Sequence, residues 1–163
     1  MYLIVSDIHG SEEGMNLIMH AAKHFQAEGI LSAGDQCPDP LYQSFYSSLI
    51  QVRGNCDRFY EYISSFPPVE RELTIYGHRT VITHGDRKCA EDYSLSPGDV
   101  FISGHTHIPS LTSSGGAILC NPGSPSRPRS SEGPTAALFL PEGLRLFSLI
   151  DFRIIKAIRF SLS

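Results

Sequence analysis

The stretch that decides the fold is Val100–Ile108, which reads Val-Phe-Ile-Ser-Gly-His-Thr-His-Ile. A short apolar run stops at Gly104, and His105 and His107 follow two residues apart. A histidine pair directly after a strand can aim two imidazole nitrogens at one small region, and imidazole binds zinc, manganese, iron and related ions. One such pair is a weak indication, so its meaning depends on the partners that other segments supply.

Four other predicted strands also end at side chains able to bind a metal ion, each with a glycine within two residues. They are Tyr2–Val5 before Asp7 and His9, Gly29–Ala33 before Asp35, Gln51–Arg53 before Asn55, and Arg79–Thr83 before His84. Binding sites of α/β sheets form at the carboxyl ends of the strands, and glycine lets the backbone turn sharply there and approach a ligand. The five endings together predict a metal site and outweigh the alternative of ordinary polar loops.

The number and type of the candidate ligands predict two ions. The seven side chains exceed what one ion needs, and with one shared carboxylate they suit a pair of ions such as two-metal hydrolases use. Imidazole, carboxylate and amide oxygen together favour Mn, Fe, Zn, Ni or Co over Ca or Mg, and manganese is the first expectation. The candidate ligands are Asp7, His9, Asp35, Asn55, His84, His105 and His107.

The order of the predicted elements indicates an α/β protein. A strand, a helix from Ser11 to about Ala27 and a second strand make a βαβ unit, which implies parallel pairing. The inward face of this helix is predicted at Leu17, Ile18, Ala21, Ala22 and Phe25. His20 and His24 lie beside that apolar stripe and are expected to face solvent.

Later segments predict two short helices and then mostly strands. The helices are expected at Leu41–Ile50 and Arg58–Ser65, with a further short one within Lys88–Pro97. A turn is expected at Ser113–Gly116 and a long proline-rich loop at Asn121–Gly133. Strands are expected at Val69–Tyr76, Ala117–Cys120, Thr135–Leu140, Leu144–Ile150 and Arg153–Phe160. No linker divides the chain, so residues 1–163 are predicted to form a single domain.

The bulk composition excludes some classes of protein. The 163 residues carry a net charge of −4, which gives no sign of the basic patch of a nucleic-acid-binding protein. Apolar runs are far shorter than the roughly 20 residues that span a bilayer, and no signal peptide is evident, so we expect a cytoplasmic protein. The four cysteines lack C-x-x-C spacing and are expected to be free thiols. Apolar strands near the C-terminus are compatible with a homodimer.

The five strand endings resemble the five ordered motifs of the calcineurin-like metallophosphoesterase superfamily. The motifs are Asp7-x-His9, Gly34-Asp35, Gly54-Asn55-x-Asp57, His84-Gly85 and Gly104-His105-x-His107. The later Asn121-Pro-Gly-Ser124 is similar to a turn of its small single-domain bacterial and archaeal phosphodiesterases. The resemblance implies a four-layer α/β/β/α sandwich, in which two mixed β-sheets are flanked by helices.

The resemblance also implies how the ligands divide between the ions. It gives one metal to Asp7, His9, Asp35 and His107, and the other to Asp35, Asn55, His84 and His105, so that Asp35 bridges them. The implied activity is a metal-dependent phosphodiesterase, in which a metal-bridging hydroxide attacks phosphorus while the metals and Asn55 neutralise charge on the phosphoryl oxygens. Asp57 is expected to orient Asn55 or a ligand histidine, to cap the helix that follows, or both.

Two positions depart from the commonest family pattern. Cys56 stands where many members have a histidine that protonates the leaving oxygen, and a thiol is a weaker acid catalyst for an alkoxide. We therefore expect phosphodiesters with good leaving groups to be favoured over monoesters of simple alcohols. The small phosphodiesterase branch commonly carries cysteine at this position, so the cysteine agrees with that branch. Asp86 replaces the second histidine of a common His-Gly-His motif and adds negative charge near the site.

The substrate side is less defined by the sequence. Arg127 is the candidate for binding the phosphate of a small ester, with Arg129 beside it, and Arg53 could instead pair with a carboxylate. Two enzymatic alternatives stay open, a phosphomonoesterase and a nucleotide-polyphosphate hydrolase. A third is a non-catalytic protein-binding scaffold, since a eukaryotic retromer subunit has this fold with part of its ligand set altered.

Overall fold

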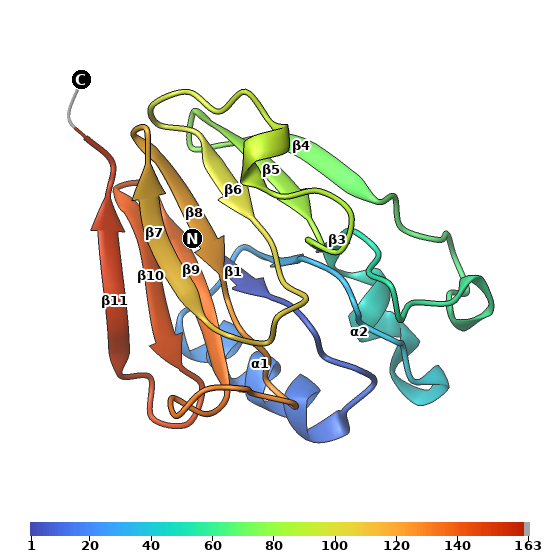
Figure 1. The fold of residues 1–163 in the computed structure, drawn as a ribbon. Helices are drawn as coiled ribbons and strands as arrows, with labels where there is room; N and C mark the ends of the chain where they lie inside the picture. The colour runs from blue at the N-terminus through green and yellow to red at the C-terminus, as the bar shows by residue number, and fades with distance from the viewer. Residues whose placement is uncertain (162–163) are drawn as a thin grey trace.

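The computed structural model describes residues 1–161 of the chain, which form two β-sheets, A and B. Sheet A is built around the apolar strand β1 (Tyr2–Val5). β1 pairs in parallel with β2 (Gly29–Ser32), which pairs in parallel with β3 (Ile50–Gln51). Three antiparallel strands continue the sheet on the other side of β1, giving the order β11-β10-β9-β1-β2-β3 (Figure 1). They are β9 (Thr135–Leu140), β10 (Gly143–Ser148) and β11 (Ile154–Arg159).

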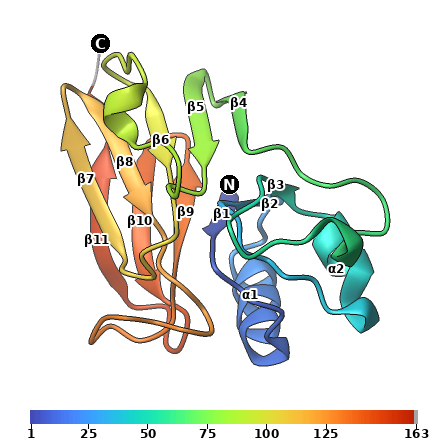
Figure 2. The same cartoon turned by 45° about the vertical axis from the view of Figure 1, so that its right-hand side comes forward.

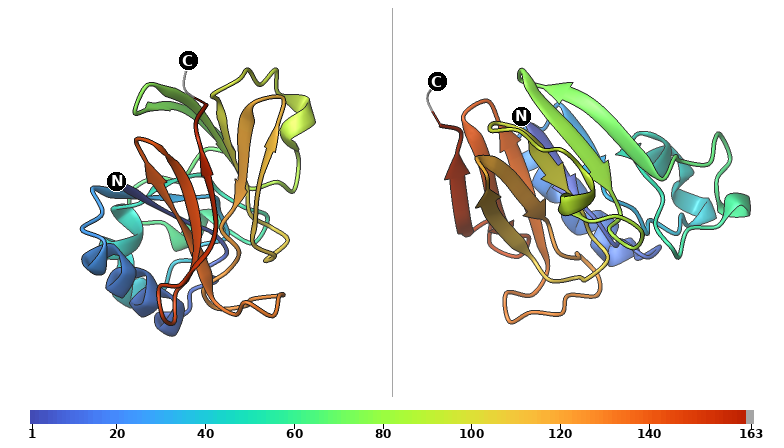
Figure 3. Two further views of the ribbon diagram at one scale, coloured as in Figure 1. Left: turned by 90° about the vertical axis from the view of Figure 1, so that its left-hand side faces the viewer. Right: turned by 45° about the horizontal axis from the view of Figure 1, so that its top comes forward.

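Sheet B has five strands in the order β4-β5-β6-β8-β7. β5, β6 and β8 are parallel to one another, while β4 and β7 are antiparallel strands at the two edges. Figure 3 shows the two sheets packed face to face, as predicted. The strands are β4 (Glu70–Ile75), β5 (His78–Thr83), β6 (Val100–Ile102), β7 (Ser110–Ser114) and β8 (Ala117–Asn121).

Two hydrophobic clusters hold these layers together. One lies between the sheets and includes Ile4, Ile82 and Phe139, each fully buried. The other lies between sheet A and its helices and includes Leu3 and Ile18. Successive residues of β1 therefore enter different clusters, because side chains of a strand alternate between its faces. A strand buried on both faces explains why β1 lacks the polar alternation of a surface strand.

Helix α1 (Glu12–His24) covers the outer face of sheet A (Figure 2). Ser11 is its N-cap, as predicted, and accepts a hydrogen bond from the Gly14 amide at 3.0 Å. The helix ends before the predicted Ala27, because Gln26 takes a left-handed backbone with φ of 52°. His20 and His24 are exposed, as expected, and their rings lie against Phe152.

The other predicted helices are shorter than expected. The segment Leu41–Ile50 holds a 3₁₀ turn at Pro40–Tyr42 and α2 (Gln43–Ser47), and its end forms β3 instead. The segment Arg58–Ser65 holds only the 3₁₀ turn Phe59–Glu61. Sheet B is covered on its outer side by loops and one 3₁₀ turn, Ala90–Asp92. Tertiary pairing of Ile50 with Leu31 of β2 overrides helix periodicity there, while Gln51 lies in a strand as predicted.

Strand β7 was not predicted from the sequence. β7 occupies part of the segment predicted as a turn, and the turn itself is confined to Gly115 and Gly116. This edge strand is mostly polar, with only Leu111 buried, so it lacks an apolar signal.

Among the described residues, no helix is long and apolar enough to cross a membrane.

Candidate metal centre

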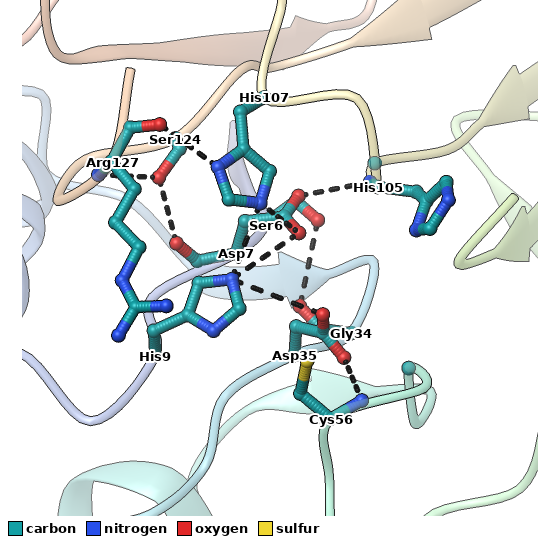
Figure 4. Close-up of polar contacts among 12 residues, drawn as sticks. Ser6, Asp7, His9, Gly34, Asp35, Cys56, His105, His107, Ser124 and Arg127 are labelled. Carbon is teal, nitrogen blue, oxygen red and sulfur yellow. Dashed lines mark hydrogen bonds and ion pairs between the residues drawn. The ribbon is translucent and has the colours of Figure 1, made fainter. Parts of the chain in front are cut away.

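The seven predicted ligands converge at the carboxyl ends of five parallel strands, three in sheet A and two in sheet B. β1, β2 and β3 carry Asp7, His9, Asp35 and Asn55, while β5 and β6 carry His84, His105 and His107. Figure 4 shows side chains from both sheets directed toward one another. The convergence follows from topology, because parallel strands of one sheet end at the same edge.

A first group of ligand atoms surrounds Asp7 Oδ1. His107 Nε2 lies 3.2 Å from this oxygen and 3.2 Å from His9 Nε2. His9 Nε2 lies 3.8 Å from Asp7 Oδ1 and 3.8 Å from Asp35 Oδ2. His107 Nδ1 donates to the Arg127 carbonyl oxygen at 2.8 Å, which leaves Nε2 with its lone pair facing the group. This is the set of four residues assigned to one metal.

A second group shares Asp35 with the first. His84 Nε2 lies 3.3 Å from Asp35 Oδ2 and 3.2 Å from Asn55 Oδ1. His105 Nδ1 lies 3.1 Å from the same amide oxygen. His84 Nδ1 is engaged with the Ala33 carbonyl oxygen at 2.8 Å, so its Nε2 is again the free nitrogen. His105 and His107 therefore lie in different groups.

The arrangement fits divalent transition-metal ions. Asp7 is completely buried, yet its Oδ1 has no hydrogen-bond partner in the structure described for residues 1–161. An unpaired buried carboxylate oxygen is costly, and a bound cation removes that cost. Asp7 Oδ1 also lies 3.9 Å from His84 Nε2, so this carboxylate stands close to both groups. Imidazole, carboxylate and amide oxygens that face one small space suit such ions.

The electrostatics of the centre place its ligands in different protonation states near pH 7. Burial lowers the pKa of His9 to about 4, with the positive charge of Arg127 adding to this effect against the opposing charge of Asp35, so His9 is neutral near pH 7. Burial raises the pKa of Asp35, but the hydrogen bond and charge of His84 outweigh it and bring the value down to about 2. For His84, burial lowers the pKa, and Asp35 outweighs it and raises the value to about 9.

Backbone strain is concentrated in the ligand loops. A left-handed backbone is uncommon outside glycine and persists where surrounding structure enforces it. Five predicted ligands have it, with φ of 56° at Asp7, 51° at His9, 55° at Asp35, 71° at His105 and 60° at His107. The sequence pattern does not reveal these backbone conformations.

Gly104 shows how closely the two sheets approach at the centre. A Cβ at this position would overlap Ser6 Oγ and lie 2.6 Å from Asp7 Oδ2. The next residue, His105, donates its backbone N–H to Asp7 Oδ2 at 3.0 Å. The absence of a side chain at residue 104 therefore lets a loop of sheet B contact a ligand of sheet A directly.

A sixth strand end supports the ligand loops, and sequence reasoning did not assign it this role. Asn121, at the end of β8, donates to the Gly104 carbonyl oxygen at 2.8 Å and to Thr106 Oγ1 at 3.1 Å. Ser124 Oγ donates to the Asp7 carbonyl oxygen at 2.8 Å. The Asn-Pro-Gly-Ser turn was the available signal, because its family likeness marked these residues without giving their contacts.

Asp57 makes neither of the contacts predicted for it. It caps no helix, since the 3₁₀ turn that follows begins after Arg58. Its Oδ2 accepts from the backbone N–H groups of Asp35 at 2.9 Å and Gly54 at 2.8 Å. Its Oδ1 accepts from the Cys37 N–H and the Tyr62 hydroxyl, both at 2.8 Å. Burial raises the pKa of this carboxyl, against these hydrogen bonds. Asp57 therefore fixes the backbone after β2 and β3 rather than any ligand side chain.

Four further predicted residues have clear positions. Cys56 donates its backbone N–H to Asp35 Oδ1 at 2.8 Å and so fixes the shared carboxylate. The Arg127 side chain extends beside His9 in Figure 4. Arg129 contributes its backbone N–H to the His107 carbonyl oxygen at 3.1 Å. Within residues 1–161 Arg53 pairs with no carboxylate, and instead donates to the Pro67 carbonyl oxygen at 2.9 Å.

Comparison with known proteins gives consistent relatives. A probable metallophosphoesterase of Methanothermobacter thermautotrophicus is 31% identical over 88% of this chain and 87% of its own. Phosphodiesterase YfcE of Escherichia coli K12 is 25% identical over 96% of both chains. A solved structure of YfcE has a TM-score of 0.87 at 23% identity, covering 98% of this chain and 99% of the other, which shows the same fold.

The fold is also similar to that of Vps29. The structure of Vps29 from Entamoeba histolytica complexed with Zn²⁺ has a TM-score of 0.68 at 16% identity, covering 98% of this chain and 99% of that one. The family model described as the calcineurin-like phosphoesterase superfamily domain matches residues 1–142. With this match over most of its length, the chain belongs to the calcineurin-like phosphoesterase superfamily.

Proposed function

We propose that this protein is a metal-dependent phosphodiesterase that hydrolyses small phosphate esters at a dinuclear centre. The observation that carries the proposal is the division of seven ligand residues into two groups that share Asp35. Four residues for each ion, with one carboxylate in common, is the arrangement expected of two adjacent cations. Mn²⁺ is the first candidate metal, and Ni²⁺, Fe²⁺, Zn²⁺ and Co²⁺ suit the same ligands.

Two divalent cations bound there would make hydroxide available as a nucleophile near neutral pH and neutralise charge on the phosphoryl oxygens. Asn55 adds a side-chain amide at the exposed side of the second group, where it can hydrogen-bond a phosphoryl oxygen. The Arg127 guanidinium, beside His9, supplies positive charge for the non-reacting phosphate oxygens. Both side chains thus orient the ester over the ligand groups.

Diester preference is proposed from Cys56. Burial raises the pKa of this thiol to about 11, and Asp35 adds to the effect. A thiol in this environment is a poor proton donor to an alkoxide, so substrates whose leaving group needs no proton are favoured.

The four cysteines are free thiols, which supports a reducing compartment such as the cytoplasm.

A non-catalytic, protein-binding scaffold is the competing proposal, because the structure of Vps29 has the same fold as this chain. The complete ligand set favours catalysis, and the unpaired Asp7 Oδ1 favours cation binding. A phosphomonoesterase or nucleotide-polyphosphate hydrolase would use the same centre, and only substrate comparison separates these activities.

Mn²⁺ added to metal-free protein is expected to produce hydrolysis of a chromogenic bis-aryl phosphodiester, and excess chelator is expected to remove it. The reason is that two bound divalent cations would supply the hydroxide nucleophile and neutralise charge on the phosphoryl oxygens. Initial rates with Mn²⁺, with Mg²⁺ and with chelator, for a diester and for the matching aryl monoester, provide the measurement. The diester is expected to be hydrolysed faster than the monoester.

The exposed His20, on α1, gives a matched control for the ligand His9. His20→Gln is expected to keep Mn²⁺-dependent turnover, while His9→Gln is expected to lose it. Turnover that is equal with and without chelator, or absent from the wild-type protein under every metal, contradicts the proposed activity. Faster hydrolysis of the monoester supports a phosphomonoesterase instead.

A further inference from the structure

The sulfur of Cys56 lies at the edge of the first ligand group. A ring nitrogen of His9, a carboxylate oxygen of Asp35 and Cys56 Sγ all lie within 4.8 Å of one another. Figure 4 shows the sulfur on the Asp35 and His9 side of the centre. Zinc binds sulfur at about 2.3 Å and nitrogen at about 2.0–2.1 Å in a tetrahedron, so two ligand atoms of one ion stand roughly 3.5 Å apart. The sulfur therefore lies near the spacing that a shared ion requires, and closer approach of these side chains completes it.

The surroundings hold Cys56 in this place. Its backbone N–H donates to Asp35 Oδ1 at 2.8 Å, so the residue moves together with the shared carboxylate. Its sulfur accepts a long hydrogen bond from Asn55 Nδ2 at 3.5 Å, while the Oδ1 of the same amide faces the second group. This hydrogen bond holds the sulfur beside the ligand cluster.

An independent observation marks this space as a cation site. Asp7 Oδ1, completely buried and without a hydrogen-bond partner in the described structure, is directed at the group that contains His9. A cation at this point would have two carboxylates, two imidazoles and the thiol as neighbours. The donor set there is softer than imidazole and carboxylate alone.

We propose that Cys56 is an additional ligand for thiophilic divalent cations at the His9 and Asp35 side of the centre. This inference rests on the proposed function, because it assumes that the same centre holds the catalytic metals. When the ion binds, the S–H bond breaks, the proton passes to solvent, and a sulfur lone pair forms the bond to the cation without any redox change. Zn²⁺, Co²⁺ and Cd²⁺ engage the thiolate, whereas the harder Mn²⁺ leaves the thiol free.

The test is absorption spectroscopy of the full-length protein titrated with Co²⁺. A sulfur-to-cobalt charge-transfer band in the near ultraviolet is expected in the wild type and is expected to disappear in Cys56→Ser. Cys37→Ser is the matched control and is expected to keep the band. Cys37 Sγ lies 4.0 Å from His9 Nδ1, the ring nitrogen that does not face His107. The visible d–d bands of Co²⁺ report binding itself, and circular dichroism reports folding of each variant.

The outcomes separate this inference from the proposed function. Visible cobalt bands without the near-ultraviolet band in the wild type overturn the Cys56 assignment, as does a band that survives in Cys56→Ser or that vanishes in Cys37→Ser alone. Mn²⁺-dependent diester hydrolysis is measured on the same preparations. Its absence, with the sulfur band present, overturns the proposed function and supports the ligand role of Cys56. Absence of all cobalt bands overturns the Cys56 assignment, while the proposed function is then decided by Mn²⁺-dependent hydrolysis alone.

Discussion

Replacing Asp35 with Asn is expected to lower Mn²⁺-dependent diester hydrolysis on the order of a thousandfold. Asp35 Oδ2 lies 3.8 Å from His9 Nε2 and 3.3 Å from His84 Nε2, so this one oxygen serves both ligand groups. Asparagine keeps the shape and can still accept the Cys56 N–H through one oxygen. It removes the negative charge that holds two cations close together, which is why the effect on kcat should exceed that of losing a ligand of one group.

The measurement is kcat/KM together with bound metal per chain for Asp35→Asn and for a matched variant, Asp39→Asn. Asp39 is a carboxylate of the same loop, and its Oδ1 accepts the Leu41 N–H at 2.8 Å, at an exposed position. Asp39→Asn is expected to retain wild-type turnover and metal content. Retained turnover in Asp35→Asn would remove Asp35 from the bridging role.

Replacing Asp57 with Ala is expected to lower the free energy of unfolding by about 3–5 kcal/mol, measured in the presence of chelator. The buried carboxylate accepts three backbone N–H groups and the Tyr62 hydroxyl. Alanine leaves these four donors without a partner in a place that water does not reach. Asparagine is expected to rescue only part of the loss, because its NH₂ group faces two donors whichever way it is turned.

Chemical denaturation of metal-free protein separates this effect from catalysis. Asp39→Ala is the control, since it removes a carboxylate that accepts one backbone N–H at an exposed turn, and its expected cost is about 1 kcal/mol. If Asp57→Ala unfolds at the denaturant concentration of the wild type, Asp57 does not act as the backbone anchor after β2 and β3.

The sequence could predict which residues meet in the metal centre because the same pattern recurs at five strand ends. Each of the five endings combines an apolar strand, a glycine and a polar side chain, and parallel topology brings such ends to one edge. The βαβ pattern around α1 supplied that topology for β1 and β2. The division of His105 and His107 between two groups followed from the family resemblance and agrees with the distances from His107 to Asp7 and from His105 to Asn55.

Other features depend on contacts that leave no periodic pattern. The left-handed backbone at Asp7, His9 and Asp35 is enforced by tertiary hydrogen bonds, such as the Asp7 N–H to the Gly34 carbonyl oxygen at 2.9 Å. The anchoring role of Asp57 involves donors 20 and 22 residues earlier in the chain. Helix lengths were overestimated where strand pairing competes with local propensity, as at Ile50, which pairs with Leu31 of β2.

The central claim is that two cations share Asp35, and anomalous diffraction from a crystal grown with Mn²⁺ tests it most directly. The account predicts two anomalous peaks, one among Asp7, His9, Asp35 and His107, and the other among Asp35, Asn55, His84 and His105. Two-metal hydrolases hold their ions about 3.5–4 Å apart, so this separation is expected between the peaks. A single peak ligated by both His105 and His107 would contradict the account.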